Sequence, residues 1–329
     1  MPIRTSTLAR ILAPLIICAA IIPAATNADA KPQVKRVFVY VMENTSYDDV
    51  VGSKDAPYLN SLIKRFALAT DYVGTGHASL GNYIAMTSGR PPNPATMADC
   101  LVYGTSLCIQ DVDNIADQLE RTGRTWKGYM DSMPRPCMHT DENTPERSQV
   151  GYSPRHNPFV YYRSIVDDQQ RCDAHVVPLT QLWKDQKFGR VPHYSFVTPD
   201  TCHDGHDSGD HCEMGGGVKE ADWFARRTIP RILADASWKD GGLLFITFDE
   251  GGIPDDDLPR PNGQLVDFGG HIYTLLASPL VKPGAKLTAQ YDHFSMLRTV
   301  EDVFCLPYLG GAKHARSMIG AVGQKRCQR

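Results

Sequence analysis

The sequence predicts an α/β fold with a mostly parallel sheet. Segments 34–42 and 242–248 are rich in β-branched and aromatic residues, as strands buried on both faces are. Between and after them, short apolar runs alternate with stretches of helical spacing, such as the apolar positions 59, 62, 63 and 66. Alternating strands and helices favour a parallel sheet, whose ligand site lies beyond the carboxyl ends of its strands.

The expected elements follow one another along the chain. Besides the two long strands, we expect strands at 67–73, 126–129, 193–198 and 272–278. Helices are expected at 56–66, from about 80, from a cap at Asp113 to about 120, at 218–233 and at 294–304. Residues 130–176 are rich in Pro, Arg, Asp and Gln without clear periodicity, which predicts an irregular insertion.

The first thirty residues have the pattern of a secretory signal peptide. Arg4 and Arg10 precede an apolar run, and Ala28-Asp29-Ala30 forms a small-x-small cleavage pattern. No later stretch has the length of a membrane helix, so we expect no stable membrane anchor. The interpretation is a signal peptide at 1–30 and a single domain at 31–329, secreted or periplasmic.

Removal of the signal leaves eight cysteines, an even number that suggests disulfides in an exported protein. Short loops close at little entropic cost, so neighbours along the chain are the expected partners. A zinc site is the alternative, disfavoured because no C-x-x-C pair occurs and the compartment is oxidising. The expected pairs are Cys100 with Cys108, Cys137 with Cys172, Cys202 with Cys212, and Cys305 with Cys327.

The charge balance gives no sign of a nucleic-acid partner. Arg4, Arg10 and Asp29 lie in the expected signal peptide. Without them, the 34 basic residues become 32 and the 37 acidic residues become 36. A general nucleic-acid binder carries a basic excess, which this chain lacks.

The two long strands each end on a pair of oxygen-bearing residues. Glu43-Asn44 follows the first strand, and Asp249-Glu250 follows the second. If both strands lie in one parallel sheet, the two pairs meet at one edge. The alternative is that they are solvated turn residues, as acids at strand ends commonly are.

Ser79 precedes a probable helix that begins around Leu80. The free amides and positive potential of a helix N-terminus favour phosphate, so the hydroxyl could attack phosphorus there. The alternative is an ordinary N-cap, a position that serine commonly occupies.

Beyond these patterns, the chain resembles the bacterial and fungal acid phosphatase and phospholipase C family, a branch of the alkaline phosphatase superfamily. It is most similar to secreted actinobacterial acid phosphatases. The matching motifs run in the family's order over nearly all of the mature chain: ENTSY at 43–47, HASLGNY at 77–83, RHNPFV at 155–160, DGHD at 204–207, TFDE at 247–250 and YDHFS at 291–295. The departures are Ala78 and Gly81, where the family usually has prolines.

The resemblance implies an alkaline-phosphatase-like three-layer α/β/α sandwich and assigns roles to named residues. Ser79 is the implied nucleophile, and His156 and His206 are phosphate-facing histidines that bind phosphoryl oxygens or protonate the leaving group. Asn82 and Asn157 are expected to bind substrate. The implied metal ligands are Glu43, Asn44, Ser79, Asp249 and Glu250. These oxygen ligands suit a hard divalent ion such as Mg²⁺, Ca²⁺ or Mn²⁺, with Zn²⁺ also considered.

The loop at 200–207 has more ligand-type residues than the family pattern. A second, nitrogen-bearing metal or phosphate site is therefore a hypothesis, formed by Asp200, His203, Asp204, His271 and His293. The alternative is a surface turn closed by a Cys202–Cys212 bridge.

The expected function is that of a secreted, metal-dependent acid phosphatase that hydrolyses phosphomonoesters through a phosphoserine. A phospholipase C acting on lipid diesters is the runner-up, because the same catalytic parts serve both reactions. A different class, a non-catalytic secreted binding protein on the same scaffold, is also considered. The expected partner is a small-molecule or lipid phosphate ester, and the oligomeric state is left open.

Overall fold

The computed structural model places eight strands of the described residues in one sheet, in the order β4-β3-β5-β1-β6-β7-β2-β8. The residues it describes are 1–2, 33–100, 103–105, 107–139, 151–252 and 269–327, and residues 32–329 form one unit. The strands are β1 (Arg36–Met42), β2 (Ala67–Ala69), β3 (Trp126–Met130), β4 (Val176–Pro178), β5 (Tyr194–Thr198), β6 (Gly242–Phe248), β7 (Thr274–Ala277) and β8 (Lys286–Leu287). The expected signal peptide lies outside the described residues, apart from the first two.

The sheet is mostly parallel, as predicted. β4, β3, β5, β1 and β6 all run in the same direction. β7 is antiparallel to β6 and to β2, while β8 pairs in parallel with β2. β1 and β6 are buried neighbours in the middle of the sheet, and their last residues, Met42 and Phe248, are paired. Both strands therefore end at the same edge.

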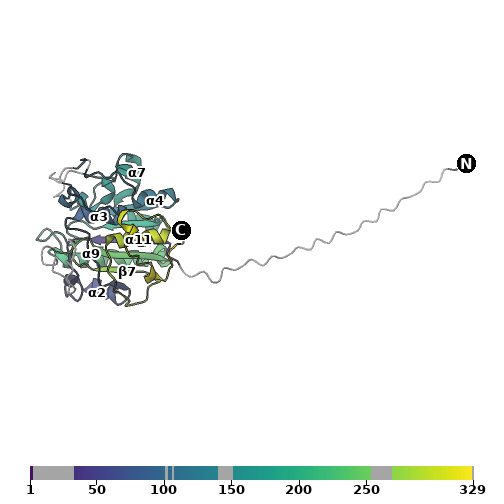
Figure 1. Cartoon of the computed structure of the whole chain (residues 1–329). Coiled ribbons are helices and arrows are strands. Elements are labelled where there is room, and N and C mark those ends of the chain that lie inside the picture. Colours follow the sequence, from purple (N-terminus) through teal and green to yellow (C-terminus); the bar gives the residue numbers. More distant parts are fainter. Residues whose placement is uncertain (3–32, 101–102, 106, 140–150, 253–268, 328–329) are drawn as a thin grey trace. The chain divides into compact units, whose positions relative to one another are not determined.

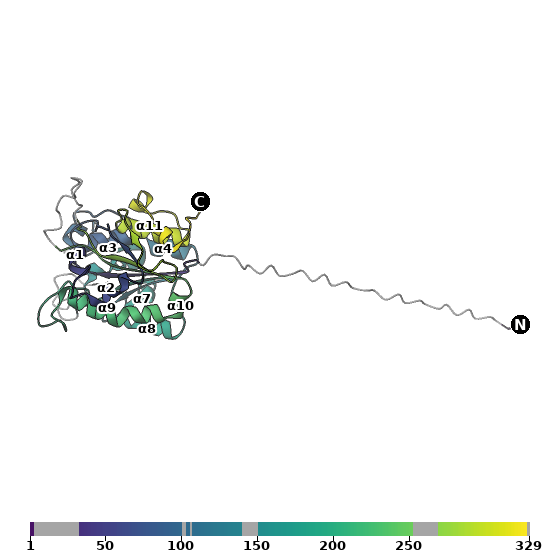
Figure 2. The ribbon, with the colours of Figure 1, turned by 90° about the horizontal axis from the view of Figure 1, so that it is seen from below.

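Helices cover both faces of the sheet, which gives the three layers that the resemblance implied (Figures 1 and 2). One face carries α3, α4 and α11, and the opposite face carries α2, α8, α9 and α10. The helices are α1 (Tyr47–Val50), α2 (Pro57–Ile63), α3 (Ser79–Ser88), α4 (Ile115–Arg121), α6 (Arg163–Val166), α7 (Gln169–His175), α8 (Thr180–Lys187), α9 (Gly217–Ala234), α10 (Ala236–Lys239) and α11 (His293–Phe304). Short 3-10 turns include η1 (Thr96–Ala98), η2 (Pro154–His156) and η3 (Pro158–Tyr161). Among the described residues, no helix is long and apolar enough to cross a membrane.

Several expected elements need correction. The cap of α4 is Asn114, not Asp113, because the Asn114 side chain accepts from two helix amides and Asp117 completes a capping box. The expected strand at 67–73 is only three residues long. The expected irregular stretch contains helices α6 and α7, and strands β4 and β8 and helix α8 were not predicted. These elements are short, and short elements give little periodic signal.

All four expected disulfides are confirmed: Cys100–Cys108, Cys137–Cys172, Cys202–Cys212 and Cys305–Cys327. Each closes a loop of at most 35 residues. Disulfides of this number are typical of proteins that fold in an oxidising compartment.

Candidate active site

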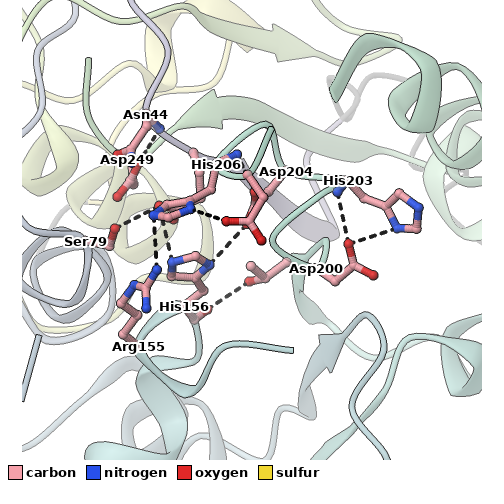
Figure 3. Close-up of polar contacts among 12 residues, drawn as sticks. Asn44, Ser79, Arg155, His156, Asp200, His203, Asp204, His206 and Asp249 are labelled. Carbon is pink, nitrogen blue, oxygen red and sulfur yellow. Dashed lines mark hydrogen bonds and ion pairs between the residues drawn. The ribbon is translucent and has the colours of Figure 1, made fainter. Parts of the chain in front are cut away.

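The polar residues that follow β1 and β6 meet at the carboxyl edge of the sheet (Figure 3). The backbone amide of Asn44 donates to Asp249 Oδ1 over 3.1 Å, and the backbone amide of Glu250 donates to the same oxygen over 2.7 Å. Asn44 has a φ of 49°, a left-handed conformation that asparagine tolerates better than most residues. The backbone turn at Asn44 thus ties the two strand ends together.

Ser79 is the first residue of α3 and points at the end of β1. Its hydroxyl donates to Glu43 Oε2 over 2.8 Å, and the residue is 3 % exposed. The N-cap of α3 is Ala78, with no side-chain cap. The serine hydroxyl is therefore not used as an N-cap.

The departures from the family motif fit this local geometry. Ala78 has a φ of 80°, which a proline ring cannot adopt because it fixes φ near −65°. At Gly81, an added Cβ would lie 3.0 Å from Pro92, so the side chain of a larger residue would press on the segment opposite. Ala78, in the turn before Ser79, and Gly81, in the first turn of α3, are therefore both residue types that this backbone accommodates.

Glu43 contacts side chains from two other elements of the site. Its Oε1 accepts from the Tyr83 hydroxyl over 2.5 Å, and its Oε2 lies 3.3 Å from His156 Nε2. Tyr83 comes from the second turn of α3, four residues after Ser79, and its ring stacks on the ring of His156 at 5.7 Å. Glu43 thus links the end of β1, helix α3 and the histidine of η2.

Asp204 and His206 approach from the loop between β5 and α9. Asp204 is fully buried, and its Oδ2 lies 3.1 Å from His156 Nδ1. His206 Nε2 accepts from Arg155 over 3.0 Å, so its Nδ1 carries the proton and donates to Asp207 over 2.9 Å. The His206 side chain is 27 % exposed, whereas that of His156 is 2 % exposed. Of these two histidines, His206 is the one that solvent reaches.

The carboxyl groups of the site have raised pKa values. Burial, followed by repulsion from Asp249 and Asp204, holds the pKa of Glu43 well above its usual range. Burial, then the charge of Glu250, does the same for the pKa of Asp249. Burial lowers the pKa of His156, and nearby Arg155 and His206 lower it further. A buried cluster of acids with this mutual repulsion favours a bound cation.

Two buried oxygens of this cluster have no hydrogen-bond partner. They are Asn44 Oδ1 and Asp249 Oδ2. An unpartnered buried polar atom is costly, and both of these atoms are types that bind hard divalent ions. Together with the oxygens of Glu43, Ser79 and Glu250, they fit the expected metal site.

The two asparagines expected to bind substrate have other contacts. Asn82 Oδ1 accepts from the backbone amides of Thr75 and Gly76, and its Nδ2 donates to Glu250 over 3.3 Å. Asn157 Nδ2 donates to the Tyr152 hydroxyl over 2.9 Å. Both are fully buried. Asn82 therefore fixes the turn that precedes Ser79 and also contacts Glu250.

The residues of the hypothetical second site are spread over several places. Asp204 lies in the centre described above, while Asp200 and His203 form a separate cluster with Asp131 (Figure 3). His203 Nδ1 lies 2.7 Å from Asp131 Oδ2 and 3.2 Å from Asp200 Oδ1. Burial lowers the pKa of His203, but hydrogen bonds to Asp131 and Asp200 outweigh it and raise that pKa to about 10. A protonated imidazole between two carboxylates holds this loop in place.

His271 and His293 lie apart from that loop. His271 stacks on Tyr47 at 4.2 Å, and its Nε2 lies 3.2 Å from the Thr70 carbonyl oxygen. His293 is fully buried, and its Nε2 donates to the carbonyl oxygen of Asp249 over 2.5 Å. The structure therefore does not gather the five residues into one metal site.

Sequence reasoning assigned no role to three residues of the site, which are Tyr83, Arg155 and Asp99. Tyr83 and Arg155 stand within the quoted motifs, so their motif positions were a usable signal. Asp99 was not singled out. Its Oδ1 accepts from the Leu80 amide over 3.0 Å, and its Oδ2 lies 3.7 Å from Arg155 Nε. Nothing in the local sequence links Asp99 to a helix that begins twenty residues earlier.

The fold is similar to that of solved structures. A protein of the alkaline phosphatase superfamily from Vibrio parahaemolyticus superimposes with a TM-score of 0.57 at 15 % identity, covering 82 % of this chain and 66 % of the other. At that identity the likeness concerns the fold, which is that of the alkaline phosphatase superfamily.

The chain belongs to the Phosphoesterase family, whose sequence model matches residues 53–307. It is 27 % identical over 290 residues to a phosphatidylinositol-3-phosphatase of Mycobacterium tuberculosis, covering 88 % of this chain and 83 % of the relative. It is 25 % identical to a probable acid phosphatase of Kluyveromyces lactis, covering 84 % of this chain and 59 % of the relative. A phosphate-repressible acid phosphatase of Penicillium chrysogenum is also 25 % identical, with 86 % and 62 % covered. The chain thus spans about three fifths of the length of these two fungal relatives. As a member of the Phosphoesterase family, it is a hydrolase that acts on phosphoric esters.

Proposed function

We propose that this chain is an exported, metal-dependent phosphatase that hydrolyses phosphomonoesters through a phosphoserine at Ser79. One observation carries the proposal. The Ser79 hydroxyl, at the N-terminus of α3, lies 2.8 Å from the buried carboxylate of Glu43, in a cluster that contains the unpartnered oxygens of Asn44 and Asp249. The names of the fungal relatives support a monoesterase.

The residues that follow the two strands, Glu43, Asn44, Asp249 and Glu250, would hold the metal together with Ser79 of α3. A bound divalent ion supplies positive charge for phosphoryl oxygens and favours the serine alkoxide. The chain itself positions the serine. Asn82 fixes the turn that places Ser79 in the first turn of α3, where the free helix amides favour an anion.

The proposed reaction has two displacements at phosphorus. Ser79 Oγ forms a bond to phosphorus while the ester P–O bond breaks, and the serine proton has Glu43 Oε2 as its nearest acceptor. The leaving oxygen takes a proton from solvent, because both ring nitrogens of His206 already have partners in Arg155 and Asp207. Water then attacks phosphorus, the Oγ–P bond breaks, and Ser79 regains its proton as phosphate leaves.

A lipid phosphate ester is the second candidate substrate. The relative from Mycobacterium tuberculosis is named for a phosphoinositide, which is a phosphomonoester on a lipid head group. A phospholipase C type of diesterase remains the alternative reaction on the same catalytic parts.

Export is proposed from two observations. Four disulfides are typical of an oxidising compartment. The basic, apolar and small-residue pattern of residues 1–30 has the order of a signal peptide, and the mature phosphoesterase domain would comprise residues 31–329.

The deciding experiment compares two substrates. Purified mature chain is treated with chelator and assayed on p-nitrophenyl phosphate and on a phosphocholine diester, with Mg²⁺, Ca²⁺, Mn²⁺ or Zn²⁺ added back singly. We expect turnover of the monoester, lost on chelation and restored by at least one ion. Full activity without metal would refute metal dependence, and preference for the diester would select the phospholipase C alternative.

A further inference from the structure

Arg155 is a buried cation of the candidate active site. It belongs to η2, directly before His156, and its side chain is 9 % exposed. Arg155 Nη2 donates to His206 Nε2 over 3.0 Å (Figure 3), but a neutral imidazole does not offset the charge of a guanidinium. A buried cation is costly unless an anion lies near it. The anion that the structure places beside Arg155 is the carboxylate of Asp99.

Asp99 lies between Arg155 and the N-terminus of α3. Asp99 Oδ2 is 3.7 Å from Arg155 Nε, and Asp99 Oδ1 accepts from the backbone amide of Leu80 over 3.0 Å. Leu80 follows Ser79 in the first turn of α3, and the N-cap residue Ala78 makes no side-chain cap. One carboxylate therefore faces both the guanidinium and a backbone amide next to Ser79.

The two groups that face Asp99 are groups that bind phosphate in proteins. The guanidinium of an arginine binds two phosphate oxygens at once, and the first amides of a helix favour an anion. A phosphoryl group joined to Ser79 lies at the same end of α3, because Ser79 is the first residue of that helix. Asp99 thus contacts the donors that such a phosphoryl group needs.

The charge of Asp99 opposes a phosphoryl group at these donors. Burial raises the pKa of Asp99, while the amide of Leu80, Arg155 and His206 act to lower it. A carboxylate and a phosphoryl dianion that face the same donors repel each other. The Asp99 side chain is 25 % exposed, whereas that of Arg155 is 9 % exposed. Asp99 is therefore the member of the pair that can turn toward solvent.

Resting on the proposed function, we propose that Arg155 binds the phosphoryl group of the substrate and that Asp99 is an internal anion that competes with it. When the substrate binds, the Asp99 carboxylate leaves the guanidinium and the Leu80 amide, and phosphoryl oxygens take its place. A phosphomonoester carries nearly two negative charges at neutral pH and a diester only one. Both the attraction by Arg155 and the repulsion by Asp99 are therefore greater for a monoester, so the pair determines specificity by charge.

The test compares substitutions with opposite expected effects. Asp99→Asn removes the charge but keeps a side-chain oxygen that can accept from the Leu80 amide. Arg155→Met removes the guanidinium, and Arg155→Lys keeps a positive charge should Arg155→Met fail to fold. The matched control is Asp117→Asn, because Asp117 also accepts from a backbone amide and lies 2.8 Å from an arginine, Arg171, outside the site.

Two measurements are made on the mature chain. Binding of inorganic phosphate is measured by titration calorimetry, with the ion that restores turnover, or with Mg²⁺ if none does. Hydrolysis is measured on p-nitrophenyl phosphate and on methyl p-nitrophenyl phosphate, a diester with the same leaving group. Both are carried out at about pH 7, where a phosphomonoester is mostly a dianion.

We expect Asp99→Asn to bind phosphate about tenfold more tightly than the wild type, because a repelling charge is removed. Arg155→Met should bind phosphate about 30-fold more weakly, the scale of hydrogen bonds to a charged group, and Arg155→Lys should lose less. For the monoester, kcat/KM should change in the same directions, chiefly through KM. For the diester it should change much less, and Asp117→Asn should behave as the wild type.

The proposal is overturned if Asp99→Asn binds phosphate no more tightly than the wild type does, which is the result expected of an N-cap alone. It is also overturned if neither Arg155 variant weakens phosphate binding, if monoester and diester change alike, or if Asp117→Asn changes as much as Asp99→Asn. Absence of turnover by the wild type on both esters would refute the proposed function instead, since phosphate binding is measured without turnover.

Discussion

At the scale of single residues, the position of Ser79 decides between two roles. Its hydroxyl bonds to Glu43 and does not cap α3, so substitution should affect chemistry far more than helix stability. We expect Ser79→Ala to lower kcat by about three orders of magnitude or more. The free energy of unfolding should fall by only about 1 kcal/mol, the value of a lost hydrogen bond.

The matched variant is Ser79→Thr, which retains a hydroxyl and should keep partial activity. Rapid acid quench of the wild type should trap phosphate on Ser79, detectable by mass spectrometry of the peptide. Near-normal turnover by Ser79→Ala would show that another group attacks phosphorus.

His293 should act on the metal site from outside it. Its Nε2 donates to the Asp249 carbonyl oxygen, and its Nδ1 lies 3.2 Å from the Tyr72 hydroxyl. Groups that orient a ligand typically change metal affinity by roughly 10- to 100-fold. We therefore expect His293→Ala to weaken Mn²⁺ binding, measured by titration calorimetry, by about tenfold.

His293→Gln retains a donor amide and should weaken Mn²⁺ binding less than His293→Ala does. Tyr72→Phe removes only the second contact and is the milder check should His293→Ala fail to fold. Unchanged Mn²⁺ affinity in all three variants would limit His293 to packing.

At the scale of elements, one polar cluster fixes α8 to the sheet. Asp185 of α8 accepts from Lys127 and Tyr129 of β3 over 2.6 and 2.9 Å. Burial raises the pKa of Asp185, but these hydrogen bonds outweigh burial and hold it below its usual range. The folded protein thus favours the ionised form of Asp185. The stability that this carboxylate contributes is fully present above the unfolded pKa of about 3.9. It is lost as the pH falls through the lower pKa of the folded state.

We expect Asp185→Asn to lower the free energy of unfolding at pH 7 by about 2 kcal/mol, the typical value of hydrogen bonds to a charged group. The difference from the wild type should shrink in urea unfolding experiments below about pH 4, the ordinary range of the group. A difference that does not change with pH would mean that the charge of Asp185 contributes nothing.

The elements also show what the sequence could and could not predict. β1 and β6 were predictable because both are long, apolar and buried on both faces, and their parallel pairing brings Glu43 and Asp249 together. Strand β4 and helix α8 were missed because three to eight residues give a weak periodic signal. The cap at Asn114 was missed by one residue, since Asp113 is an equally good capping type.

In the site too, residues in sequence motifs could be singled out from the sequence, whereas contacts between distant segments could not. Glu43, Ser79 and Asp249 stand in the quoted motifs, and the structure brings them together at the carboxyl edge of the sheet. The contact of Asp99 with Leu80 joins segments that only the tertiary fold brings together. His293 stands in a motif too, but its burial beneath Asp249 depends on where α11 packs, which no local pattern reveals.

At the scale of the whole molecule, a buried acidic centre lies between the middle strands and α3. Glu43, Asp204 and Asp249 are all fully buried, and their mutual repulsion opposes folding when they are ionised. The rest of the fold stabilises this cluster in advance of any ligand. Such a site gains stability when a divalent ion binds the native chain and not the unfolded one.

Metal binding should therefore raise the thermal stability of the mature protein. At a metal concentration of about 100 times Kd, linkage predicts a gain of about 2.7 kcal/mol, which amounts to a few degrees in Tm for a domain of this size. Differential scanning calorimetry of chelated protein, with and without added ion, measures the shift. Asp249→Asn removes the carboxylate that carries one of the two unpartnered oxygens and should abolish the shift. The matched control is Asp222→Asn: Asp222 is also buried, but its carboxylate accepts from the amides of Tyr58 and Leu59. That variant should start from a lower Tm and still show the full metal-induced shift, because its loss concerns α2 and α9 alone. An equal shift in wild type and Asp249→Asn would place the ion elsewhere.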